Sequence, residues 1–517
     1  MEKDKSEMID CCLKALLFSL IKIIGLLDTN NFSMFKYFLI AILDCSKNLK
    51  NHLIYLIKIE NLIEFLKRVL TVDFTFNMKE FDDQVLNFSL RIIVCEIFFN
   101  LKQEKYFFKL DNIAEAIQLL IKFAQRVIVM NIEKKMFLIS NTLRLMSQMI
   151  TQIHTMPEAY ERVLKTNSIE FVKDALTLSK DLQPCINIDA LFCLTNMMNI
   201  KELATHKQLL CPETVNNSMV IYFAYNHQVE LDECIITFLY TISKYPQYQV
   251  YMKDKSKVLY LLMERQFEQK YETTTDTSRQ KIFSLFHNMT ENEEICQQLN
   301  AKQFINLTNK MLQQTNINKY SADHIHELAL KSIINMCKNP SETFEEANLK
   351  EFLSNICKMY PKFKNLSKQY ALRLITILTK KWQQQKIQDF MQEIIDIMSQ
   401  FIENCESVIE LKLVIMNLEK VASSKQLMKC LADLTVSCKQ LIKNIHYFIA
   451  KNIMKKDYHS SIEQLFRFCK KLSKQHKAQE YLVNENIHEI CLRYISENLK
   501  FKETKDDGDL KQVLTTI

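Results

Sequence analysis

Glycine is almost absent from this sequence, with Gly25 and Gly508 the only two in 517 residues. Tight β-hairpin turns depend on residues that adopt positive φ without steric cost, and glycine is the main one. P-loops, dinucleotide-binding turns and nucleophile elbows also need glycines, because the backbone must approach phosphate closely or turn under strain. The scarcity of glycine therefore predicts an all-α fold and excludes the commonest nucleotide-binding sites.

A short pattern recurs along the middle of the chain. Residues 191–197 (LFCLTNM), 283–289 (FSLFHNM) and 330–336 (LKSIINM) each place Asn before Met, with apolar residues five and two places ahead of the Asn. Asn196, Asn288 and Asn335 are separated by 92 and 47 residues, and Thr241 fills the missing midpoint. Weaker matches extend the frame to about ten units of 40 to 53 residues, at Asp44, Ile97, Gln148, Ile377, Asn417 and Lys470.

A period of this length is typical of units of two or three helices that bury their apolar faces only against their neighbours. Prolines in polar breaks fall between the units, at Pro157, Pro184, Pro212, Pro246 and Pro340. We therefore expect a right-handed α-solenoid. Residues 1–500 would form one continuous domain and residues 501–517 a polar tail.

The recurring pattern resembles the third helix of armadillo repeats over about residues 30–495. The units lack the glycine that separates the first two armadillo helices, so HEAT-like packing stays open as an alternative. The resemblance implies that the third helices line a concave groove. It also implies that Asn196, Asn288 and Asn335 belong to a ladder that binds the backbone of an extended peptide.

Two clusters of polar residues suggest chemistry at first sight. His326-Glu327 and His488-Glu489 do not continue into the H-E-x-x-H zinc motif. Asp323, His326 and Glu327 share one helix face by spacing, but we expect a helix start capped by Ser321 or Asp323 rather than a metal or acid-base site. We also expect His287, in the stretch LFHNMTENEEI, to be a packing histidine. No catalytic residue, metal or cofactor is predicted.

Cysteine usage and the N-terminus bear on location. The 16 cysteines form no C-x-x-C pair, which indicates buried thiols in a reducing compartment. The apolar stretch 11–27 is interrupted by Lys14 and Lys22, which favours an amphipathic helix over a membrane span. We expect a cytoplasmic protein, with a cytoskeletal or ciliary assembly as the more specific hypothesis.

Positive charge is concentrated toward the C-terminus. Residues 355–386 hold eight basic and no acidic side chains, and residues 439–477 hold ten basic and two acidic ones, although the whole chain carries only +7. The candidate partner-binding residues within these blocks are Lys380, Lys381, Trp382, Arg467, Lys470, Lys471 and Lys474. The last four fall at i, i+3, i+4 and i+7, which places them in one stripe of a helix.

Four interpretations of the basic blocks stay open: a solvated lysine surface, a surface for an acidic protein segment, a surface for RNA, and a surface for an anionic membrane. Trp382 is either a core residue or a platform for a base or a partner side chain. We predict a non-enzymatic scaffold or adaptor that binds other proteins with acidic segments and belongs to a larger complex. An RNA-binding α-solenoid is the alternative.

Overall fold

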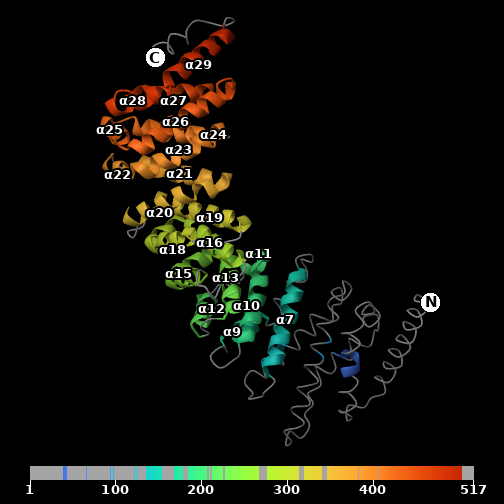
Figure 1. Ribbon diagram of the computed structural model, residues 1–517. Coiled ribbons are helices and arrows are strands. Elements are labelled where there is room, and N and C mark those ends of the chain that lie inside the picture. Colours follow the sequence, from blue (N-terminus) through green and yellow to red (C-terminus); the bar gives the residue numbers. More distant parts are fainter. Residues whose placement is uncertain are drawn as a thin grey trace, which may run out of the picture. The chain divides into compact units, whose positions relative to one another are not determined.

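The computed structural model describes ten stretches of the chain, drawn as coloured ribbons in Figure 1. They are residues 135–153, 168–177, 184–205, 212–224, 228–266, 276–313, 319–340, 346–381, 384–405 and 407–502, together with the short piece 39–43 and a few positions between 66 and 125 and at 209. All regular elements in these stretches are helices. Contacts divide the chain into two units, Met1–Tyr251 and Met252–Ile517.

The first unit is built of helices that pack in two layers. Its described elements are α7 (Lys135–Ile153), α9 (Ser168–Thr177), α10 (Pro184–Met198), α11 (Lys201–Ala204), α12 (Pro212–Ala224) and α13 (Val229–Ser243). Helix α10 packs between α7 and α13, while α9 contacts α10 and α12. Helices α7, α10 and α13 therefore form one layer, and α9 and α12 lie on a second.

Three prolines begin helices. Pro184 is the first residue of α10, Pro212 of α12 and Pro246 of α14 (Pro246–Lys253). Proline is favoured at this position because its missing N–H would have no partner within the helix, and its fixed φ already suits the helix. Of the predicted breaks between units, the one at Pro246 follows the third helix α13 and is confirmed, whereas Pro184 and Pro212 begin helices within a repeat.

The second unit repeats a second and a third helix, preceded in several repeats by a short first helix. Its elements are α15 (Ser256–Arg265), α16 (Asp276–Glu291), α17 (Glu293–Gln298), α18 (Ala301–Gln313), α19 (Lys319–Lys338), α20 (Glu346–Met359), η5 (Tyr360–Lys362), α21 (Asn365–Lys381), α22 (Gln384–Asp389), α23 (Met391–Glu403), α24 (Val408–Val421), α25 (Lys425–Asp433), α26 (Thr435–Asn452), η6 (Lys456–Tyr458), α27 (His459–Leu472), α28 (His476–Asn484) and α29 (Ile487–Lys502).

Two layers of helices run through this unit. Helices α16, α19, α21, α24 and α27 pack in that order and form the third-helix layer. Helices α15, α18, α20, α23 and α26 pack in the same way and form the second-helix layer, which α29 follows (Figure 1). This is an α-solenoid of armadillo/HEAT-type repeats, which confirms the predicted fold class.

Aromatic side chains fill the space between the layers. The Phe286 ring of α16 lies 5.1 Å from that of Tyr260 on α15 and 5.0 Å from that of Phe304 on α18. All three side chains are buried. Burial of each stabilises the fold by about 2 kcal/mol, so the apolar positions of the repeat hold the layers together.

The predicted period is confirmed by where the recurring residues lie. Gln148, Asn196, Thr241, Asn288, Asn335, Ile377, Asn417 and Lys470 all fall within helices α7, α10, α13, α16, α19, α21, α24 and α27, one in each. Hydrogen bonds between repeats show the same period. Asn196 and Ser147 are 49 residues apart, and Asn335 and Thr290 are 45 apart.

The predicted helix start at Ser321 or Asp323 is wrong. Helix α19 begins at Lys319, so both residues lie inside it. Asp323 instead serves the next repeat, because its carboxylate lies 2.6 Å from Lys364 Nζ. A polar residue that holds two repeats together can therefore have the sequence pattern of a helix cap.

Several predictions about domains and the termini stay untested. The single continuous domain over residues 1–500 is still a prediction. Helix α29 runs to Lys502, and the rest of the predicted tail lies outside the described residues, as does the amphipathic stretch 11–27. Among the described helices, none has the length and apolar character needed to cross a lipid bilayer.

Candidate functional site

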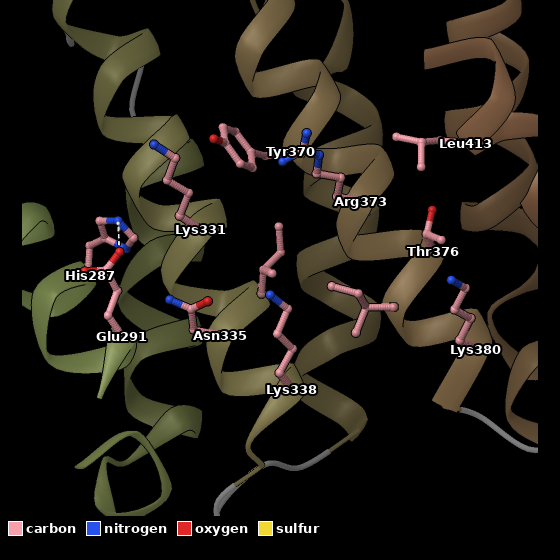
Figure 2. Close-up of a pocket in the computed structure, with 12 residues that line it drawn as sticks. His287, Glu291, Lys331, Asn335, Lys338, Tyr370, Arg373, Thr376, Lys380 and Leu413 are labelled. Atoms are coloured by element: carbon pink, nitrogen blue, oxygen red, sulfur yellow. Dashed lines mark ion pairs between the residues drawn. The ribbon is translucent and has the colours of Figure 1, made fainter. Parts of the chain in front are cut away.

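A basic pocket of about 600 Å³ opens on the third-helix layer of the second unit (Figure 2). Four consecutive third helices line it. The residues are His287 and Glu291 from α16, Lys331, Ile334, Asn335 and Lys338 from α19, Tyr370, Arg373, Thr376, Ile377 and Lys380 from α21, and Leu413 from α24. The pocket thus gathers residues from repeats that are far apart in the sequence.

Helices α19 and α21 present the same arrangement to the pocket. Lys331, Asn335 and Lys338 are spaced i, i+4 and i+7 on α19, and Arg373, Ile377 and Lys380 have that spacing on α21. The two cations of each helix are separated by seven residues, or roughly 10 Å along the axis. The pocket therefore has two rows of cations, Lys331 with Arg373 and Lys338 with Lys380, on either side of Asn335 and Ile377.

Positive charge exceeds negative charge in the pocket. Four cations face it, and Glu291 is the one carboxylate among the lining residues. Arg373 and Lys380 are exposed and form no ion pair with any described residue. These two side chains can therefore pair with an anionic partner without breaking an existing salt bridge.

Lys331 and Tyr370 are held in place by their neighbours. Lys331 Nζ lies 2.6 Å from Glu327 Oε1 and 5.0 Å from the centre of the Tyr370 ring. Partial burial lowers the pKa of Lys331, but the hydrogen bonds and charges of Glu327 and Tyr370 together outweigh it and keep that pKa above its usual value. The Arg373 guanidinium also lies over the Tyr370 ring, at 5.4 Å. Lys331 is thus fully charged at neutral pH.

His287, which was predicted to be a packing histidine, is half-buried on α16 and also lines the pocket (Figure 2). Its Nε2 lies 3.4 Å from Glu291 Oε1. Burial lowers the pKa of His287 and outweighs the opposing effect of Glu291, so the ring is largely neutral at pH 7. His287 therefore adds a polar group to the pocket rather than a fifth cation.

The asparagines of the repeat pattern contact neighbouring helices. Asn335 Nδ2 donates to Thr290 Oγ1 of α16 at 3.4 Å. Its Oδ1 accepts no hydrogen bond from the described residues, and the side chain lines the pocket. Asn335 thus keeps one acceptor for a partner. Asn288 is half-buried on α16 and is not among the residues that line the pocket.

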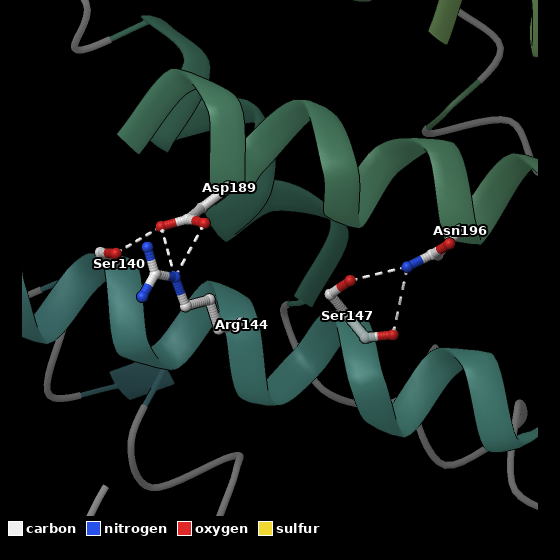
Figure 3. Close-up of polar contacts among 5 residues, drawn as sticks. All are labelled: Ser140, Arg144, Ser147, Asp189 and Asn196. Carbon is white, nitrogen blue, oxygen red and sulfur yellow. Dashed lines mark hydrogen bonds and ion pairs between the residues drawn. The ribbon is translucent and has the colours of Figure 1, made fainter. Parts of the chain in front are cut away.

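Asn196 lies in the first unit, where polar contacts join α7 and α10 (Figure 3). Its Nδ2 donates to Ser147 Oγ at 2.7 Å and to the Ser147 carbonyl at 3.4 Å. Two turns away, Asp189 of α10 accepts hydrogen bonds from Ser140 Oγ and Arg144 Nε of α7. The Asn196 amide nitrogen therefore holds two repeats together, and its role in binding a partner stays a prediction.

The other predicted partner-binding residues are divided among three places. Lys380 lines the pocket. Lys381 ends α21, but its side chain and all of Trp382 lie outside the described residues. Arg467, Lys470 and Lys471 are exposed on α27 and Lys474 is exposed just after it, apart from the residues that line the pocket.

Asp323, His326 and Glu327 do not converge on a common point. The His326 ring is buried 5.0 Å from that of Phe363, and burial lowers its pKa to about 4. Glu327 pairs with Lys331, and Asp323 pairs with Lys364. In the part of the chain that the structure describes, no three His, Cys, Asp or Glu residues are placed to hold a metal ion.

Lys331, Lys338, Tyr370 and Arg373 were not predicted as residues of one site. The sequence does contain a signal for this site. The i, i+4, i+7 spacing of Lys331, Asn335 and Lys338 on α19 recurs 42 residues later as Arg373, Ile377 and Lys380 on α21. Two of these cations lie before the basic block at 355–386. A search for contiguous charge therefore could not find the pocket.

Comparisons with known proteins support the fold. No family model and no curated protein matches the chain. Among solved structures, an engineered protein is similar at 12% identity with a TM-score of 0.51, covering 88% of this chain and 97% of its own. That likeness shows the fold alone.

Two further solved structures have TM-scores below 0.5, and no inference rests on them. One comes from work on the interaction between cadherin and beta-catenin, with 10% identity, a TM-score of 0.43 and coverage of 96% of this chain and 97% of that one. The other is a complex of SYS-1 with POP-1, with 11% identity, a TM-score of 0.44 and coverage of 97% and 95%.

Proposed function

We propose that this chain is a non-enzymatic scaffold that binds an acidic, extended segment of a partner protein across the third-helix layer of the second unit. The observation that carries the proposal is the basic pocket, where Lys331, Lys338, Arg373 and Lys380 surround Asn335. Arg373 and Lys380 are the anchors, since neither is paired with a carboxylate of the described residues.

An extended segment suits this geometry. Neighbouring packed helices lie about 8–10 Å apart, which an extended chain covers in about three residues. Successive side chains of such a chain point to opposite sides, so acidic residues can reach both rows of cations. Asn335 Oδ1 can accept a backbone N–H of the segment, which fixes its position between the rows.

The charges contribute more to the encounter than to the final affinity. Each solvent-exposed ion pair contributes about 0.2–1 kcal/mol, so several are needed for measurable binding. A patch of one sign also steers an oppositely charged partner and makes association sensitive to salt. We therefore expect moderate affinity that weakens as ionic strength rises.

RNA binding through the same pocket is the second candidate function, and Tyr370 argues against it. Single-stranded nucleic acid is held by bases stacked on aromatic side chains, and Tyr370 is the one Phe, Tyr or Trp among the residues that line the pocket. Lys331 and Arg373 already lie over its ring. A base would have to displace these cations before it could stack.

The test is a competition measured by fluorescence anisotropy on the full chain. A labelled poly-glutamate peptide is bound at about 100 mM salt, where surface charges beyond about 10 Å are screened. Single-stranded RNA of about 20 nucleotides, longer than a typical single binding site, is then added. The proposal predicts that the peptide binds and that RNA neither displaces it nor is retained. Retention of RNA with no peptide binding would favour the alternative.

The cytoplasmic location and the cytoskeletal or ciliary assembly stay predictions. They rest on the sequence and on the general use of such solenoids, which is an analogy at the level of the fold. Identification of proteins captured by the tagged full chain from its native cells tests them directly. Recovery of proteins from an unrelated compartment would contradict both predictions.

A further inference from the structure

An apolar stripe lies beside the basic pocket on α24. Ile409, Leu413 and Met416 are spaced i, i+4 and i+7, so they share one face of the helix. Leu413 lines the pocket, which places that face on the same side as the cations. Ile409 is 74% exposed and Met416 is 42% exposed. The stripe is thus an uncovered apolar surface that continues the pocket.

One residue of the stripe, Met416, occupies a position that holds a polar group two repeats earlier in the third-helix layer. A shift of 39 residues superposes the buried Leu372 and Ile375 of α21 on the buried Leu411 and Val414 of α24. The same shift places Met416 at the position of Ile377, which itself corresponds to Asn335 of α19. The middle of the surface therefore changes from amide to apolar between α19 and α24.

Helix α27 follows α24 in the third-helix layer and restores positive charge. A shift of 51 residues superposes the buried Leu411 and Leu418 on the buried Ile462 and Cys469. It places the exposed Arg467 at the position of Met416. From α19 to α27 the layer thus presents cations, then an apolar stripe on a helix that also exposes Lys412 and Lys420, then cations again.

We infer that the partner segment of the proposed function carries apolar residues between two acidic stretches, so that its apolar side chains cover Leu413 and Met416. The inference rests on that function and adds the order of the partner's residues. One acidic stretch lies against Arg373 and Lys380, and the other lies against Arg467. Because each helix spans about three extended residues, the apolar residues lie about three positions from each acidic stretch.

Charge alone does not explain this surface. A partner that was acidic throughout would place carboxylates against Ile409, Leu413 and Met416, where they would lose water. Only the exposed Lys412 and Lys420 of α24 could pair with some of them. An apolar residue at that point instead removes apolar area from water on both molecules. The stripe therefore selects among acidic partners, whereas the cations attract all of them.

Three peptides of equal length and net charge test the inferred order of acidic and apolar residues in the partner segment. The first has two leucines between acidic stretches, the second has serines in their place, and the third carries the leucines at one end. Each is titrated against the full chain. The inference predicts that the first binds about tenfold more tightly than the other two. Equal affinities for all three would overturn it.

Two matched variants test whether the preference for the first peptide depends on the apolar stripe. Met416→Glu changes an exposed apolar residue of the stripe, and Val436→Glu changes one that is 81% exposed on α26 in the second-helix layer. Met416→Glu should abolish the preference for the first peptide, and Val436→Glu should leave it intact. Equal effects of the two variants would contradict the inference, and circular dichroism confirms that both variants fold.

The two proposals fail in different ways. If all three peptides bind equally and charge reversal at Arg373 and Lys380 weakens them, the scaffold proposal stands and the inferred order is wrong. If no peptide binds, the proposed function itself is wrong. If only the leucines matter and charge reversal has no effect, the apolar stripe is a binding surface but the acidic stretches are not part of its partner.

Discussion

Asn417 of α24 donates a hydrogen bond from Nδ2 to Thr376 Oγ1 of α21 at 3.0 Å and accepts one from Thr379 Oγ1 at 2.7 Å. Its amide also donates to the Leu413 carbonyl at 2.9 Å, and the side chain is only 1% exposed. Asn417 therefore fixes two neighbouring third helices relative to each other. Both helices contribute residues to the basic pocket.

Asn417→Ala should lower the free energy of unfolding by about 2 kcal/mol, because it leaves buried polar groups without their partner. Asn335→Ala is the matched control, since that side chain is half-buried and makes a single bond of 3.4 Å. It should cost about 0.5–1 kcal/mol. Urea denaturation followed by circular dichroism measures both. Equal losses would show that Asn417 does not hold the two helices together.

Asn335→Ala should affect binding more than stability. Its Oδ1 faces the pocket without a protein hydrogen bond from the described residues, so its loss removes an acceptor for the partner's backbone. We expect about a five- to tenfold loss of affinity for an acidic peptide, in line with one hydrogen bond of about 1 kcal/mol. Titration of the wild type and the variant measures it. Unchanged affinity would remove Asn335 from the proposed site.

His326 should make the fold sensitive to acid. Its pKa is about 4 in the folded chain and about 6.5 when unfolded, because burial disfavours the charged ring. The unfolded state therefore binds more protons below pH 6.5, and stability falls as pH drops from about 6.5 toward 4. The full loss is on the order of 3 kcal/mol.

His326→Phe should flatten this dependence, since a phenyl ring can keep the contact with Phe363 and does not titrate. His476→Gln is the control, because His476 is exposed on α28. Melting temperatures at pH 7 and pH 5 measure the effect. A drop between those values that is as large in His326→Phe as in the wild type would show that other groups cause it.

The repeat could be predicted from the sequence because each third helix buries the same apolar positions, as at Phe283 and Phe286. The pocket could not, because Lys331 and Arg373 come together only when α19 packs against α21. The role of Asp323 was missed for a similar reason. Its partner Lys364 is 41 residues away, and spacing within one helix carries no information about that contact.

The central claim is that the basic pocket binds an acidic protein segment, and charge reversal tests it most directly. Arg373→Glu with Lys380→Glu alters two exposed cations of the pocket. Lys443→Glu with Lys451→Glu makes the same change in charge on α26, where both lysines are exposed in the second-helix layer. The two double variants thus have equal net charge and differ in which layer is altered.

The measurement is the affinity of the full chain for a labelled acidic peptide in these two double variants. We predict that the pocket variant loses at least about tenfold in affinity, since two favourable ion pairs become repulsive. The α26 variant should lose less than about threefold, through the change in net charge alone. Equal losses in the two variants would contradict a specific site and leave only nonspecific attraction to a basic surface.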